Sequence, residues 1–200
     1  QAVWRLSEDM RERILSTTGI TKGFGHILAL QDISLEVIQG DITAIVGDNG
    51  SGKSTLIKIL SGNIKPDRGQ INIGGDNYRS LTIPRAMELG IRTVYQDLAL
   101  DNFKNSVENI FLGSERMHGP FLARRAMMEE ARSLLADIHV EIPDLEEPVR
   151  NLSGGQRQGI AIARALRRPG TLLLLDEPTA AMGIQESHST MQMLSRLRER

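Results

Sequence analysis

The chain has 200 residues, 40% of them hydrophobic, and its 24 Lys and Arg against 25 Asp and Glu give a formal net charge of −1. These values suit one globular domain with a substantial core, and they exclude the global basic field that attracts nucleic acid. The lack of cysteine excludes disulfides and thiolate metal sites, and no apolar run approaches the ~20 residues of a membrane-spanning helix, so we expect a soluble chain.

The two ends of the chain differ from its middle. Residues 1–13 are expected to be an N-terminal extension, and residues 14–200 to form one domain. From Ile14 to Ile38, short apolar stretches alternate with turn glycines, which predicts antiparallel strands. Near the other end, the amphipathic pattern over Gln185–Arg200 predicts a helix without a C-cap, so we expect the chain to be cut short there.

A glycine-rich loop follows the apolar run Ile42–Val46, which predicts a strand. The loop reads GDNGSGKS over residues 47–54, and a predicted helix follows it. Its glycines let backbone N–H groups approach a chain of phosphates, Lys53 adds charge for the β- and γ-phosphates, and the Ser54 hydroxyl can ligate Mg²⁺. A chance match to the bare pattern is expected on the order of once in a hundred chains of this length. The strand before it and the helix after it favour a P-loop that binds nucleotide.

Strands and helices alternate downstream of this loop. In chain order, the pattern first predicts a helix to Leu60 closed by Gly62, a strand over Gln70–Ile73 and a strand ending at Thr93–Gln96. It then predicts mostly helix over residues 104–136 and a connector over 138–149. The last elements predicted before the carboxylates are a helix over 156–168 and a buried strand over 171–175. One apolar stripe, expected to fill the core, consists of Met127, Met128, Ala131, Leu134 and Leu135. The alternation predicts an α/β fold with a parallel sheet flanked by helices.

Two carboxylates follow the buried strand over residues 171–175. Asp176 and Glu177 lie where ligands bind at the carboxyl end of parallel strands. Beside a P-loop, Asp176 is expected to hold Mg²⁺ through water, and Glu177 to polarise the attacking water as general base. The alternative is an acidic pair stabilised by a helix N-terminus.

A second motif, Leu-Ser-Gly-Gly-Gln over residues 152–156, opens the preceding helix. Ser153 and Gln156 fit a capping box, which is the structural alternative. A cap does not require Gly154 and Gly155, and two glycines at a positive helix end expose backbone N–H groups that can bind an anion. One domain thus carries two predicted phosphate-binding surfaces.

These motifs together resemble the ATP-binding cassette (ABC) ATPase family. The resemblance rests on Gly47–Thr55, Gln96, Leu152–Gln156 and Leu172–Thr179, and it runs from about Ile14 to the end of the chain. It implies an α/β P-loop NTPase with a RecA-like parallel core sheet, an N-terminal antiparallel β subdomain and a helical subdomain over about residues 97–165. It also implies ATP and Mg²⁺ as ligands, and two cassettes packed head to tail, so that the second motif of one covers the γ-phosphate held by the other.

The resemblance also implies roles for individual residues. The implied nucleotide contacts are Phe24, Gly47, Asp48, Asn49, Gly50, Ser51, Gly52, Lys53, Ser54, Thr55, Ser153, Gly154, Gly155 and Gln156. The implied catalytic residues are Glu177, Gln96 and Lys53, and the implied Mg²⁺ ligands are Ser54, Gln96 and Asp176. Phe24 would stack on adenine, with a buried core phenylalanine as the alternative. For Gln96 the alternative is an ordinary glutamine at the end of a strand.

The chain departs from the family pattern in two places. Most cassettes have an aspartate where Gly183 stands, which puts coupling between paired sites in doubt. The family also places a histidine on a later loop, beyond residue 200, and His188 is no substitute because it lies within the helix after Gly183. This chain is therefore expected to bind ATP better than it hydrolyses it.

Further segments resemble the ATPases of monosaccharide importers, and the intact motif at 152–156 is more like their single-cassette, fructose-type members. The segments are Tyr95–Leu100, Glu108–Gly113 and Gly154–Gln158. This resemblance implies a second cassette, a transmembrane permease and, indirectly, a periplasmic or extracellular sugar-binding protein as partners, with no nucleic acid. It also implies a peripheral location at the cytoplasmic face of the inner membrane.

Three functions remain open from the sequence. The first is an ATPase subunit that powers sugar import. The second is a soluble cassette acting on ribosomes or DNA, which a tandem cassette or a basic face would favour. The third is a non-hydrolysing, nucleotide-binding regulatory module, which the missing histidine keeps open.

Overall fold

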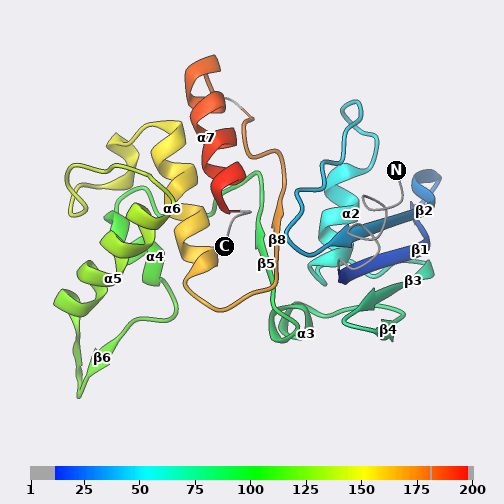
Figure 1. The fold of residues 1–200 in the computed structure, drawn as a ribbon, viewed down its shortest axis with the longest axis horizontal. Helices are drawn as coiled ribbons and strands as arrows, with labels where there is room; N and C mark the ends of the chain where they lie inside the picture. The colour runs from blue at the N-terminus through cyan, green and yellow to red at the C-terminus, as the bar shows by residue number, and fades with distance from the viewer. Residues whose placement is uncertain (1–11, 181, 198–200) are drawn as a thin grey trace, which may run out of the picture. The chain divides into compact units, whose positions relative to one another are not determined.

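Figure 1 shows the computed structural model, which describes residues 12–180 and 182–197. The chain divides into two compact units: the first ends at Arg92 and takes in Gly170–Leu174, and the second comprises Thr93–Pro169 and the chain from Leu175 onward. Most of the expected extension over residues 1–13 and the last three residues of the expected terminal helix lie outside the described residues.

A four-stranded antiparallel sheet forms much of the first unit. Its strands are β1 (Arg13–Phe24), β2 (Ile27–Ile38), β3 (Arg68–Ile73) and β4 (Asp76–Tyr78), in the order β2-β1-β3-β4. Alternate side chains of these strands, such as Leu15, Ile20 and Ile71, are at most 1% exposed. The antiparallel strands predicted from Ile14 to Ile38 are thus confirmed, whereas β4 and the short helix α3 (Ile83–Glu88) were not predicted.

Helix α2 (Lys53–Leu60) starts within the glycine-rich segment 47–54, directly after Gly52. It buries its apolar face, and Ile59 is fully inaccessible. The helix ends as predicted at Gly62, which has a φ of 79°. The Asn63 N–H returns to the Lys58 carbonyl at 2.9 Å, which is the bond expected when glycine ends a helix in the left-handed conformation.

The predicted strand over Ile42–Val46 is absent from the structure. Residues 41–48 carry no regular secondary structure, and Val46 is 88% exposed. A strand is stabilised only when neighbouring strands pair with its edges and cover its apolar side chains. Among the described residues, no strand pairs with this segment, so its apolar composition alone does not make it a strand.

Two short strands, β5 (Ile91–Val94) and β8 (Leu172–Leu175), form a separate sheet. The Leu172 N–H donates to the Gly90 carbonyl at 3.3 Å, and the Asp176 N–H donates to the Val94 carbonyl at 3.0 Å. The sequence offset is the same at both bonds, so the strands run parallel. This confirms the two predicted strands that precede Gln96 and Asp176.

The second unit is mainly helical. Its helices are α4 (Ser106–Phe111), α5 (Arg124–Asp137), the 3₁₀ helix η1 (Val149–Asn151), α6 (Gly154–Leu166) and α7 (Ile184–Leu197). The helix predicted to start at residue 156 starts two residues earlier. Of the predicted apolar stripe on α5, Met127, Ala131 and Leu135 are buried, whereas Met128 and Leu134 are half-buried.

A small hairpin interrupts the segment predicted to be mostly helical over residues 104–136. Its strands are β6 (Met117–His118) and β7 (Phe121–Leu122), and the turn between them contains Gly119 with a φ of 60°. A Gly-Pro pair in the sequence could have marked this turn, because glycine adopts a positive φ at little cost and proline cannot continue a helix.

Within the part of the chain that the structure describes, no helix is long and apolar enough to cross a lipid bilayer.

Candidate nucleotide site

The Lys53 side chain folds back into the loop that precedes it. Its Nζ donates hydrogen bonds to the carbonyl oxygens of Gly47 at 2.8 Å and Asp48 at 2.9 Å. Both acceptors are neutral, so they leave the positive charge uncompensated, and an ammonium has a third donor. The loop therefore presents a cation that an anionic ligand bound against it would contact.

The loop is too tightly packed at Gly52 to accept a side chain, whereas at Gly47 the nearest obstacle is the rotatable hydroxyl of Ser51. A Cβ on Gly52, whose φ is 93°, would lie 2.4 Å from the Ala29 carbonyl oxygen on β2. A Cβ on Gly47 would lie 2.7 Å from the Ser51 Oγ. Gly52 is thus required both by its left-handed backbone and by the contact that seats the start of α2 against β2.

The aromatic ring of Phe24 lies at the end of β1 and is 46% exposed. The alternative of a buried core phenylalanine is therefore wrong. The Lys22 Nζ lies 5.5 Å from the ring centroid, within the range of a cation–π contact. The exposed ring leaves a flat apolar surface on which a planar ligand can stack.

Asp67 fixes the backbone beside this ring. Its carboxylate accepts hydrogen bonds from the Gly23 N–H at 2.8 Å and the Lys22 Nζ at 2.7 Å. The backbone bond from Gly23, followed by the bond from Lys22, lowers the pKa of Asp67. The sequence showed a turn at Asp67 but gave no signal of its pairing with residues 44 and 45 positions earlier.

In the second unit, the carboxylates after β8 lie in a turn. Asp176 is 6% exposed, and Glu177 is half-buried with a φ of 49°. The Ala180 N–H donates to the Glu177 carbonyl at 3.0 Å, which closes the turn. Helix α7 begins only at Ile184, so the alternative of an acidic pair at a helix N-terminus is wrong.

Gln96 follows β5 by two residues and is exposed. Because the Asp176 N–H bonds the Val94 carbonyl, the parallel pair brings the carboxyl ends of β5 and β8 side by side. Gln96 and Asp176 therefore leave their strands at the same sheet end, which is where ligands bind in parallel sheets. Among the described residues, no three His, Asp or Glu side chains cluster as a metal site.

The predicted capping box at the start of α6 is present. The Ser153 Oγ accepts from the Gln156 N–H at 3.3 Å, and the Gln156 Oε1 accepts from the Ser153 N–H at 3.0 Å. The N–H groups of Gly154 and Gly155 make no hydrogen bond to any residue in the described ranges. The turn therefore combines a completed cap with two free donors at the positive end of a 13-residue helix, as an anion site requires.

The start of α7 lies next to this turn. A Cβ on Gly154 would lie 3.5 Å from the Glu186 Oε2, and that oxygen accepts from the Gly183 N–H at 3.4 Å. His188 is on α7, as expected.

The site residues fall in both units. Phe24 and residues 47–55 belong to the first, whereas Gln96, residues 153–156, Asp176 and Glu177 belong to the second. Besides Asp67, Arg164 on α6 was not predicted from the sequence; its guanidinium donates to the backbone carbonyls of Leu98 and Ala99, which follow Gln96. A single arginine in the otherwise apolar run Ile160–Leu166 was the available signal.

Comparison with known sequences places these motifs in a family context. A sequence profile described as ABC transporter matches residues 30–180. The xylose/arabinose import ATP-binding protein of Sulfolobus acidocaldarius is 42% identical over 187 residues, which span 94% of this chain and 74% of the relative. The fructose import ATP-binding protein of Rhizobium meliloti is 38% identical over 95% of this chain and 76% of its own length. A ribose import ATP-binding protein of Escherichia coli O157:H7 is 37% identical over 93% of this chain, which spans only 37% of that relative.

Solved structures give the same result for the fold. An ATP-binding cassette of an ABC transporter superposes with a TM-score of 0.81 at 27% identity, over 94% of this chain and 78% of that one. A dimeric cassette in a post-hydrolysis state, bound to ADP and Pi, superposes with a TM-score of 0.76 at 28% identity, over 93% of this chain and 83% of that one.

Proposed function

Because this chain belongs to the ABC transporter family, we propose that it is the ATP-binding and ATP-hydrolysing subunit of an importer that moves a sugar through a partner membrane permease. The observation that carries this proposal is that one chain presents two groups suited to contact an anion. The Lys53 loop offers a cation, and the Gly154–Gly155 turn offers two N–H groups that bond no residue in the described ranges. Residues 14–200 would form one ABC domain, with its helical subdomain over about residues 97–165.

The reaction assigns a role to each surface. The loop from Gly47 to Thr55 would hold the triphosphate of ATP, and Phe24 would stack on adenine. Glu177 would accept a proton from a water molecule as the water oxygen attacks the γ-phosphorus. The bond from that phosphorus to the β–γ bridging oxygen breaks, which yields ADP and phosphate. Positioning and charge neutralisation supply most of the rate enhancement in such a transfer.

Mg²⁺ would be held by Ser54, Gln96 and Asp176. These side chains supply hydroxyl, amide and carboxylate oxygens, which are the donors that Mg²⁺ prefers. The ion, when bound, supplies charge neutralisation on the phosphate oxygens.

A second copy of the chain would be the partner that brings the Lys53 loop of one chain together with the Gly154–Gly155 turn of the other. Its Gly154–Gly155 turn would cover the γ-phosphate bound by the Lys53 loop of the first copy. The permease, and through it a periplasmic or extracellular sugar-binding protein, would be the further partners. The chain itself would lie at the cytoplasmic face of the inner membrane. The sugar class is inferred from the relatives that import xylose/arabinose, fructose and ribose.

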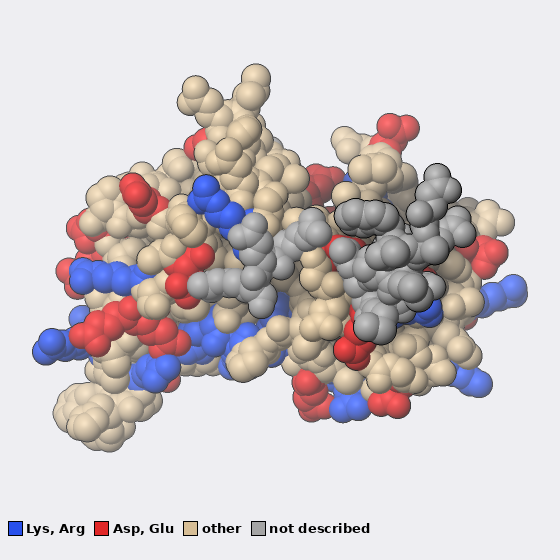
Figure 2. All heavy atoms as spheres, in the orientation of Figure 1, with Lys and Arg blue, Asp and Glu red and all other residues tan. Residues whose placement is uncertain are grey.

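The two alternatives, a soluble cassette acting on ribosomes or DNA and a non-hydrolysing, nucleotide-binding regulatory module, are less well supported. The relatives named above are all import proteins. Figure 2 shows Lys and Arg interspersed with Asp and Glu over the face that it draws, rather than a continuous basic surface. No nucleic-acid partner is therefore proposed.

The variant Glu177→Gln tests the proposal. Loss of the proton acceptor should abolish turnover and leave an ATP-bound dimer, because glutamine keeps the shape of glutamate but cannot take the proton. Size-exclusion chromatography with Mg-ATP should show a dimer for this variant, and the exposed-site control Glu36→Gln should behave as the unmodified protein. A Glu177→Gln protein that stays monomeric, or that hydrolyses ATP normally, contradicts the assignment.

A further inference from the structure

We propose that Arg164 is a positioning residue, which fixes the segment after Gln96 to the helix that begins with the Gly154–Gly155 turn. Both ends of this connection lie in the second unit. The inference rests on the proposed function, because it takes the roles of Gln96 and of the glycine turn from it.

The Arg164 guanidinium holds two successive carbonyl groups. Its Nη1 donates to the Ala99 oxygen at 2.9 Å, and its Nη2 donates to the Leu98 oxygen at 2.5 Å. Ala99 has a φ of 47°, a left-handed conformation that a non-glycine residue keeps only when its surroundings impose it. The forked contact to both carbonyls is such a restraint.

The environment of the Arg164 side chain is unusual for a positive charge. It is partly buried, no carboxylate among the described residues forms an ion pair with it, and desolvation lowers its pKa. Partial burial of an unpaired charge is unfavourable unless hydrogen bonds compensate it. An apolar side chain would fill this position of α6 without that cost, so the two carbonyl contacts are what the arginine provides.

A second arginine on the same face of α6 contacts the same segment. Arg157 lies seven residues before Arg164, and its Nη2 donates to the Asn102 Oδ1 at 3.2 Å. The Arg150 N–H, just before α6, donates to the Asn102 carbonyl at 3.2 Å. The segment from Leu98 to Asn102 therefore follows the length of α6 and is held at both ends.

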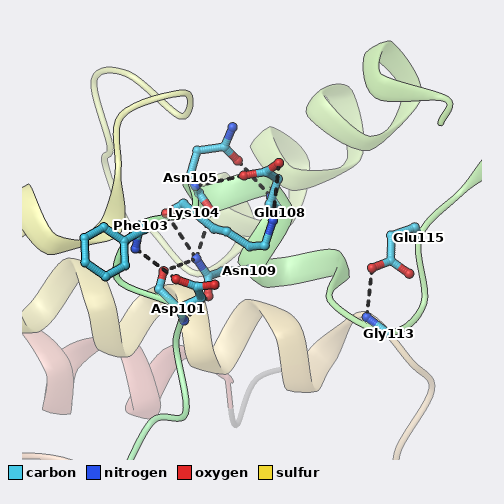
Figure 3. Close-up of polar contacts among 8 residues, drawn as sticks. All are labelled: Asp101, Phe103, Lys104, Asn105, Glu108, Asn109, Gly113 and Glu115. Atoms are coloured by element: carbon cyan, nitrogen blue, oxygen red, sulfur yellow. Dashed lines mark hydrogen bonds and ion pairs between the residues drawn. The ribbon is translucent and has the colours of Figure 1, made fainter.

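Helix α4 fixes the continuation of this segment (Figure 3). The Asn109 side chain is fully buried, and its Oδ1 accepts from the Asp101 N–H at 2.8 Å. Its Nδ2 lies 3.0 Å from the carbonyl oxygens of both Asp101 and Asn105. With its backbone groups bonded to α4 and α6, the segment after Gln96 has little freedom to move by itself.

Helix α6 converts this attachment into coupling. A 13-residue helix is a rod of about 20 Å, with the Gly154–Gly155 turn at one end and Arg164 near the other. A displacement of the turn toward the phosphate of a second chain therefore displaces Leu98 and Ala99, and with them Gln96. Arg164 would thus make the position of Gln96 depend on whether the second chain is engaged.

A double-mutant cycle on ATP hydrolysis tests this role. Gln96→Ala and Arg164→Met should each lower kcat about tenfold, with KM for ATP nearly unchanged. If Arg164 acts through Gln96, the double variant should be no slower than either single variant, because the two changes remove the same effect. Arg164→Lys, which keeps the charge but not the fork, should lie between the wild type and Arg164→Met. Arg125→Met, at a 92% exposed side chain on α5, is the matched control and should leave kcat unchanged.

The outcomes separate the two levels of the proposal. A double variant about a hundredfold slower than wild type would show independent effects and overturn the role of Arg164. A Gln96→Ala variant with unchanged kcat would instead overturn the role of Gln96 in the proposed function. If Arg164→Met does not fold, the same cycle with Arg164→Lys distinguishes coupled from independent effects. Hydrogen exchange at the amides of residues 97–102 should be faster in both Arg164 variants, and unchanged exchange contradicts the attachment.

Discussion

The Lys53 ammonium reaches back six residues along the chain and donates a hydrogen bond to the Gly47 carbonyl oxygen, 2.8 Å away. This bond closes the glycine-rich loop around its own cation. The loop is thereby shaped before any ligand arrives, so less ordering entropy is lost when a phosphate binds.

Replacing Lys53 by alanine should remove both the charge and this closure. A charge-assisted contact contributes about 1.5–3 kcal/mol, so ATP affinity should fall on the order of ten- to a hundredfold. Isothermal titration calorimetry measures this directly. Lys65→Ala, at an exposed position outside helices and strands, removes the same charge elsewhere and should leave the affinity unchanged. Equal affinities for wild type and Lys53→Ala would rule out the phosphate role.

Gly52→Ala should be far more destabilising than Gly25→Ala. Both glycines have a positive φ, but only at Gly52 would the new Cβ collide with a backbone atom, the Ala29 oxygen at 2.4 Å, whereas at Gly25 it meets nothing within 4 Å. The left-handed backbone alone costs about 1 kcal/mol, and the steric conflict at Gly52 adds roughly 1–3 kcal/mol. Urea denaturation of the two variants gives the comparison, and similar free energies of unfolding would contradict it.

Phe24→Ala should weaken ATP binding without affecting the triphosphate contacts. Stacking of a base on an aromatic side chain contributes about 1–3 kcal/mol, so the affinity for ATP should fall about tenfold. The affinity for inorganic triphosphate, which has no base, should not change. Phe121→Ala removes another exposed ring, 75% accessible on the hairpin, and serves as the control. A parallel loss for both ligands would point to loop distortion rather than stacking.

Asp67 should make stability depend on pH in the acidic range. Its pKa is lowered in the folded state by the Gly23 N–H and by Lys22, so the folded protein favours the ionised carboxylate more than the unfolded chain does. The resulting stabilisation is present above the unfolded pKa of about 3.9 and is lost as the pH falls through the lower, folded value.

The variant Asp67→Asn removes this charge. Wild type should therefore be more stable than Asp67→Asn at pH 7, and the difference should shrink below about pH 4. Denaturant titrations at several pH values measure this difference. Asp76→Asn, at an exposed strand end, is the control. A difference between wild type and Asp67→Asn that persists unchanged at about pH 2, well below the unfolded pKa, would contradict the ion pair.

Local sequence patterns predicted the elements whose cause is local. The helix end at Gly62, the capping box of Ser153 and Gln156, and the apolar strand before Asp176 each depend on a few adjacent residues. The motifs proposed to bind ligands were visible for the same reason, since their glycines and charges lie within short segments of the chain.

Interactions between distant residues were not visible in the sequence. The bonds from Arg164 to Leu98 and Ala99 span 66 and 65 residues, and no periodic pattern records them. The segment Ile42–Val46 is the opposite case, because a strand was predicted there and the structure has none. Its composition favours a strand, yet a strand depends on partners elsewhere in the chain, and no local rule supplies them.

The left-handed backbone torsion of Glu177 (φ 49°) creates a conflict at this position between the stability of the fold and the proposed catalytic role. Glycine would relax that torsion, since it adopts positive φ freely, whereas the proposed reaction uses the carboxylate of Glu177. Laboratory evolution that selects for heat tolerance alone should therefore replace Glu177 by glycine, and yield a more heat-stable protein that no longer hydrolyses ATP.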